Sequence, residues 1–139
     1  MNFTRIALAT LASTAAYFVV GGVLFMLIPF ADEIRKYPSV YRPQDDYGRV
    51  MPLGMLGLLL SMLALAVMYA LFYRGGAGLV EGARFGALVG AFAAGSFFMH
   101  NYVSLNIGLK LTVLQATSYF LQWMMVGVVI GLIYRPLVR

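Results

Sequence analysis

The chain has a single histidine, His100, in the stretch FFMHNYVSLN. An imidazole can bind zinc, copper or iron, ligate a haem, or carry a proton near neutral pH. Asn101 follows His100 directly, and in the next apolar run Gln115, Ser118 and Gln122 lie three and four residues apart, which places these three on one face of a helix. Together they form a candidate polar seam, either a binding site or a structural clamp. The seam consists of His100, Asn101, Gln115, Ser118 and Gln122.

Little else in the sequence supports chemistry at this seam. The absence of cysteine excludes disulfides, thiolate metal sites and thiol catalysis. A metal at His100 would need further ligands such as Asp32 and Glu33, and a haem held by two histidines would need two chains. Ser104 lies four residues from His100, but no supporting motif accompanies the pair. We therefore expect no enzyme, no resident metal and no cofactor, with haem or metal at His100 as an alternative.

Composition indicates what surrounds these residues. The chain is 62% hydrophobic and 11% charged, against roughly 45–50% apolar and about 25% charged in ordinary soluble domains. Its apolar runs have the length of about 20–25 residues that a helix needs to cross a bilayer. Since backbone groups in lipid must bond within their own segment, each run should be a helix. The chain (1–139) is thus predicted to form one transmembrane domain, with spans at residues 6–30, 51–73, 85–105 and 111–134.

Short connections predict how the spans pack. The second and third loops, RGGAGLVEGAR and NIGLK, are brief, so spans two and three and spans three and four should each form a tight antiparallel hairpin. The predicted fold is an all-α, up-down four-helix transmembrane bundle. The first loop, residues 31–50, is the only long one, and it is either a solvated charged turn, or a cap over the bundle or a docking surface for a partner. Its candidate surface residues are Asp32, Glu33, Tyr37, Tyr41 and Tyr47.

The third span carries small residues at helical spacing. In lipid, such stripes allow the close backbone contact that holds helices together. Continuing the same spacing reaches His100, which predicts that His100 lies on the packing face, level with Gln115. By the same count, Trp123 and Gln122 should lie opposite the alanine pair. The helix-packing residues are Gly82, Gly86, Gly90, Ala93 and Ala94.

Charges bear on mechanism and orientation. No Asp or Glu falls inside a span, which argues against a proton-coupled exporter or pump subunit. Five Lys and Arg residues lie on each side of the predicted membrane, so their numbers do not decide the orientation of the chain. In the first loop acidic residues balance the positive charges, which favours an orientation with both termini in the cytoplasm. The net charge of +5 lies at span ends, facing lipid headgroups rather than nucleic acid. The positive residues on the side of the two termini are Arg5, Arg74, Arg84, Arg135 and Arg139. Those on the side of the first loop are Arg35, Lys36, Arg42, Arg49 and Lys110.

The last 60 residues or so resemble small uncharacterised bacterial four-span inner-membrane proteins. The resemblance rests on EGARFGALVG, on HNYVSLN with its Asn101–Tyr102 pair, and on GVVIGLIYRP at the end of the fourth span. It implies a bacterial inner membrane and no particular activity.

These observations together favour a non-catalytic accessory or scaffold subunit of a larger membrane assembly. One alternative is a small transporter or channel, including a dual-topology homodimer, with Asn101, Gln115 and Gln122 lining the path. The other is a cofactor- or ligand-binding module around His100. The expected partners are membrane lipids and either other membrane subunits or a second copy of the chain, with no nucleic acid.

Overall fold

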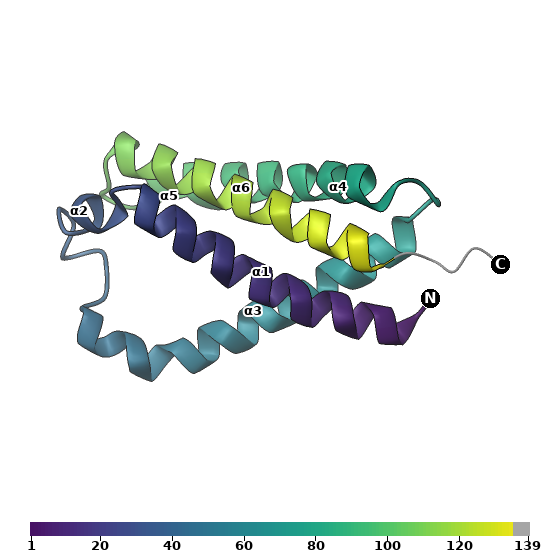
Figure 1. Ribbon diagram of the computed structural model, residues 1–139. Coiled ribbons are helices and arrows are strands. Elements are labelled where there is room, and N and C mark those ends of the chain that lie inside the picture. Colours follow the sequence, from purple (N-terminus) through teal and green to yellow (C-terminus); the bar gives the residue numbers. More distant parts are fainter. Residues whose placement is uncertain (135–139) are drawn as a thin grey trace.

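The computed structural model describes residues 1–134, whose regular structure is entirely helical. Four helical segments are long and apolar enough to cross a membrane, and they run alternately up and down (Figure 1). The predicted all-α four-helix bundle is confirmed, and the chain is a multi-pass membrane protein. Arg135, Pro136 and Arg139 lie outside the described residues. The elements are α1 (Phe3–Leu27), α2 (Phe30–Ile34), α3 (Gln44–Phe72), α4 (Gly78–Ala93), the π-helical η1 (Ala94–Met99), α5 (His100–Ser104) and α6 (Leu109–Ile133).

The α3 helix begins earlier than the apolar run that predicted it. Pro43 precedes its first residue, and Asp45 and Asp46 lie in its first turn, where a negative charge favours the helix N-terminus. Tyr47 therefore belongs to α3 rather than to the loop. Pro52 lies inside the helix, where it removes one backbone donor.

Helices α4 and α6 form the closest interface. A Cβ atom added at Gly86 would lie 2.6 Å from the carbonyl oxygen of Met124, and one added at Gly82 would lie 2.5 Å from that of Gly127. A Cβ at Gly127 would in turn collide with the backbone of Gly86. The predicted stripe thus packs as expected, with Ala94 half-buried and the others buried. Its counterpart on α6, Gly127 and Gly131, was not anticipated.

Replacement of Gly86 by alanine tests this contact. Because the added methyl group meets backbone rather than a flexible side chain, we expect G86A to lower the free energy of unfolding by about 1–3 kcal/mol. The matched control is G22A on α1, where no atom lies within 4 Å of the added Cβ. Unfolding in mixed detergent micelles measures both. Equal stability of the two variants would contradict the close contact.

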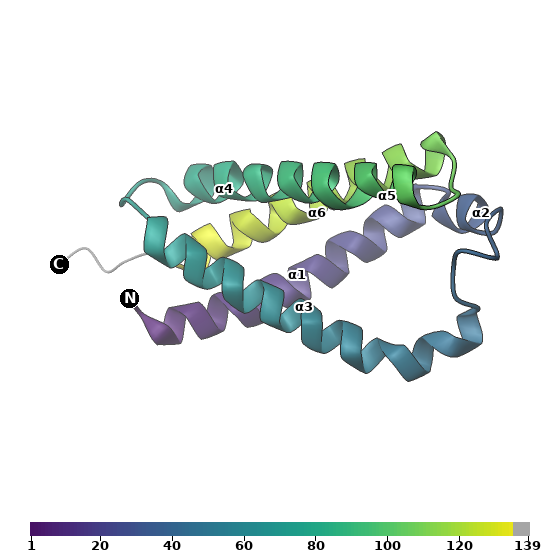
Figure 2. The same cartoon turned by 180° about the vertical axis from the view of Figure 1, so that it is seen from behind.

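The other two long helices are held by different neighbours: α1 packs mainly on α6, and α3 mainly on α1. Helix α3 crosses α1 in the N-terminal half of α1, where it also touches α6 (Figures 1 and 2). A core at the end that carries the N-terminus joins the three helices. It contains Ile6, Ala9, Met62, Ala66, Tyr69, Val126, Ile130 and Tyr134.

The predicted hairpin of the second and third spans does not form as a tight pair. From the turn at Gly75, α3 diverges from α4, and its N-terminal half diverges from α1 as well (Figure 2). Cβ atoms added at Gly54 and Gly57 would have nothing within 4 Å. The small-residue face of α4 is already covered by α6, and bulky side chains such as Phe85 and Leu88 face the space toward α3. A short loop therefore fixed the direction of α3 but not its packing.

Candidate functional site

The single histidine does not lie on the packing face. Its side chain is exposed, and Phe97, on the same predicted stripe, is 58% exposed. The π-helical turn η1 between Ala94 and Met99 is the reason. A π-bulge carries one extra residue per turn, which rotates the following residues by about 100° around the axis. Phe98 consequently takes the inward position and stacks on Tyr119 with ring centroids 4.1 Å apart, so the prediction for His100 is wrong.

The other seam residues lie in different environments from the exposed His100. Asn101 is half-buried. The Gln115 side-chain amide donates to the Tyr41 hydroxyl at 3.1 Å. Ser118 and Gln122 are buried, and the Gln122 amide lies where a side chain on Gly21 of α1 would be. The five residues therefore form no common site, and Trp123 packs against Tyr17 of α1, with ring centroids 5.4 Å apart, rather than over the alanine pair.

Two polar atoms of α6 stand out at the α1 interface. The Ser118 hydroxyl and the Gln122 side-chain carbonyl oxygen are buried without a hydrogen-bond partner among the residues that the structure describes. An unpaired side-chain amide in hydrocarbon is unfavourable by several kcal/mol, which makes the oxygen of Gln122 an exception to the usual pairing of buried polar groups. Neither residue lines the hollows that flank α3.

The first loop forms a cap over the end of the bundle opposite the N-terminus. Glu33 of α2 is only 5% exposed, and its carboxylate accepts from Lys36 at 2.8 Å and from Lys110 at 2.6 Å. The Tyr37 hydroxyl accepts from the backbone N–H of Gly108 at 2.9 Å. Beneath these bonds lies an apolar cluster of Phe30, Ile107 and Leu111. Of the interpretations of the first loop given above, the cap describes the part of the loop that carries Glu33 and Tyr37.

Electrostatics reinforce the cap. Hydrogen bonds from Lys110 and then from Lys36 hold the pKa of Glu33 below its ordinary value of 4.5. The hydrogen bond to Glu33 raises the pKa of Lys36. Asp32, by contrast, is exposed and pairs loosely with Arg35 at 3.7 Å. A carboxylate that is easier to ionise in the folded state stabilises the fold above its unfolded pKa and loses that effect as pH falls.

This linkage gives a testable pH dependence. Thermal stability of the wild-type chain in detergent should fall as pH decreases from about 4.5 toward the lower pKa of folded Glu33. The variant E33Q should melt at a lower temperature at neutral pH and show a flatter dependence across this acidic range. The control D32N removes an exposed carboxylate whose surface pair with Arg35 contributes little to stability, and it should keep a profile close to that of the wild type. An E33Q profile parallel to that of the wild type would refute the role of Glu33.

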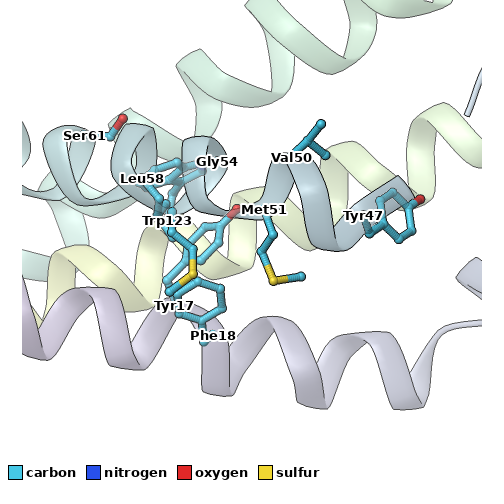
Figure 3. A pocket seen from close by; sticks show the side chains of 10 residues that line it. Tyr17, Phe18, Tyr47, Val50, Met51, Gly54, Leu58, Ser61 and Trp123 are labelled. Carbon is cyan, nitrogen blue, oxygen red and sulfur yellow. The ribbon is translucent and has the colours of Figure 1, made fainter. Parts of the chain in front are cut away.

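Two of the hollows beside α3 are mainly apolar and were not predicted from the sequence. A crevice of about 480 Å³ lies between α1 and α3, and in Figure 3 Met51 of α3 points into the space above Tyr17 and Phe18 of α1. A groove of about 590 Å³ lies between α3 and α4 and is lined by residues such as Ala64 and Leu88. The sequence feature that could have indicated open space beside the second span is its row of small residues. The row comprises Gly54, Gly57, Ser61 and Ala64.

The proposed metal ligands are not brought together. Within residues 1–134 no group of three or more His, Cys, Asp or Glu side chains is arranged to hold a metal ion. Asp32 and Glu33, considered above as partners for His100, are engaged with Arg35 and with two lysines.

Comparison with known proteins adds no relative to these observations. No family model matches the chain, and no curated protein or solved structure matches it. The chain is therefore a multi-pass, all-helical membrane protein whose function has to be inferred from its own surfaces.

Proposed function

We propose that this chain is a non-catalytic accessory or scaffold subunit of a larger assembly in the bacterial inner membrane, and that its α3–α4 groove receives a transmembrane helix of another subunit. The observation that carries the proposal is the exposure of α3. Its buried residues are confined to its C-terminal half, at Met62, Ala66 and Tyr69. A long apolar helix that contacts its own chain along so little of its length is available to a partner.

The lining of the groove fits a helix rather than a polar ligand. Apart from Ser61, the residues that face it are apolar, among them Met68 of α3 and Phe92 of α4. Ala64 is exposed in the groove, and Gly57, about two turns away on α3, has open space beside it. Small residues at this spacing let a second backbone approach, which is what drives helix association in lipid.

The polar residues of the chain support a structural rather than a catalytic role. Glu33 is bound by two lysines in the cap, and Gln115 is bound by Tyr41. A catalytic site needs a nucleophile, a base and an orienting group within reach of one another. The residues of the candidate seam do not form one cluster, because His100 is exposed whereas Ser118 and Gln122 are buried.

Location and orientation are part of the proposal. The resemblance of the last two spans to small bacterial inner-membrane proteins supports the choice of membrane. Both termini then lie in the cytoplasm, because the acidic residues of the first loop and of the first turn of α3, namely Asp32, Glu33, Asp45 and Asp46, offset the positive charge on the opposite side. Lipids and partner subunits are the proposed contacts.

Cysteine cross-linking in native membranes tests the docking groove. The chain has no cysteine of its own, so a thiol-attached photo-cross-linker reports on one position only. We expect A64C to give one discrete adduct with another polypeptide, because Ala64 lines the groove. The control V19C lies on α1, is 66% exposed and lines neither hollow, and should give no such adduct.

Two results would contradict this proposal. An adduct of twice the 15.2 kDa chain mass as the sole product would indicate a homodimer. The same set of products from A64C and V19C would mean that the groove selects no partner.

A further inference from the structure

The crevice between α1 and α3 continues into basic hollows at the loop end of the molecule. Tyr47 lines both the crevice and a second hollow of about 370 Å³, which Arg42 and Arg35 also line. A third hollow of about 330 Å³ is lined by Arg42 and Arg49 and shares Val50 with the crevice. An apolar space therefore passes directly into one bordered by arginine side chains.

Two of these arginines are available to a ligand. Arg42 and Arg49 are exposed, and neither forms an ion pair within 4 Å in the described part of the chain, whereas Arg35 is paired with Asp32. Asp46 is the one acidic residue that lines the third hollow. The charged residues that line this hollow, Arg42, Arg49 and Asp46, therefore carry a net charge of +1. They lie at the level where α3 emerges from the apolar region.

The dimensions match one leaflet of a bilayer. From Val50, which also lines the hollow of Arg42 and Arg49, to Ser61, α3 rises about 17 Å along the crevice at 1.5 Å per residue. Half of a hydrocarbon core is roughly 15 Å thick. An acyl chain that begins at the arginine level would thus run along the crevice to Trp123, which lies at its inner end beside Leu58 (Figure 3).

We propose that this crevice is a binding site for an anionic phospholipid. The phosphodiester group pairs with Arg42 and Arg49, and one acyl chain lies between α1 and α3 against Tyr17, Phe18 and Met51. The crevice lies between α1 and α3 and the docking groove between α3 and α4, although Ser61 and Trp123 line both. Bound lipid would fill the gap beside the N-terminal half of α3 and hold it at its observed angle to α1.

Quenching of Trp123 tests the site, since it is the sole tryptophan. Phosphatidylglycerol brominated at mid-chain is titrated into the full chain in neutral detergent micelles. We expect saturable quenching at concentrations at which brominated phosphatidylcholine quenches weakly. Each arginine near an anionic group should contribute about 5-fold in affinity, so R42Q/R49Q should bind phosphatidylglycerol roughly 30-fold more weakly.

Matched variants locate the lipid. R5Q/R74Q removes the same charge at the opposite end of the membrane and should keep wild-type affinity. G54L places a side chain in the crevice, where Gly54 has open space around it, and should abolish saturable quenching. G57L makes the same change outside the crevice lining, also in open space, and should leave quenching intact.

Four results would overturn the proposal. The first is equal quenching of Trp123 by brominated phosphatidylglycerol and brominated phosphatidylcholine. The second is equal affinity of R42Q/R49Q and R5Q/R74Q for phosphatidylglycerol, and the third is equal binding of this lipid by G54L and G57L. The fourth is displacement of phosphatidylglycerol by millimolar inorganic phosphate. The last would indicate a phosphate site that does not use the acyl chain. Equal binding of the lipid by G54L and G57L would be expected if a second copy of the chain or a partner helix, rather than lipid, occupied the crevice.

Discussion

The close contact between α4 and α6 is the constraint from which the other helix positions follow. Glycines occur on both sides of this interface, so the backbones approach until an added methyl group at Gly86 or Gly127 would meet main-chain atoms. Because no hydrophobic force pairs helices in lipid, this van der Waals contact and the cap must supply the association. The interface uses the small-residue face of α4. Helix α1 then packs on another face of α6, and α3 contacts α1 instead of its sequence neighbour.

The π-helical turn adds a second constraint with a consequence for function. In the α-helical part of the third span the stripe ends at Ala93, and beyond η1 the inward position passes to Phe98. The Ser96 hydroxyl donates to the Phe92 carbonyl at 2.6 Å within this turn, a local bond of the kind that competes with regular helix pairing. The same rotation that seats Phe98 against Tyr119 turns His100 outward, so the residue with the richest chemistry has no polar site around it.

Much of the architecture was predictable, because it depends on local periodicity. Apolar runs gave the four spans, short loops gave the antiparallel order of α4 and α6, and glycine spacing gave their packing face. The position of His100 was not predictable, since one extra residue in a helical turn leaves no trace in composition. A cap was one interpretation of the first loop, but its bonds were not predictable, because they join residues 71 to 77 positions apart, such as Tyr37 to Gly108 and Glu33 to Lys110. The divergence of α3 reflects competition between helices for one face, which no single segment encodes.

The chain thus consists of a clamped unit of α1, α4 and α6 and a helix, α3, that contacts it only through its C-terminal half. A cap seals the unit at the loop end, and open apolar surface remains on both sides of α3. Native mass spectrometry of the chain, extracted gently from the membrane in which it is made, tests the central claim most directly. The account predicts a mass that contains at least one other polypeptide in addition to the 15.2 kDa chain. A monomer or a homodimer alone would contradict it.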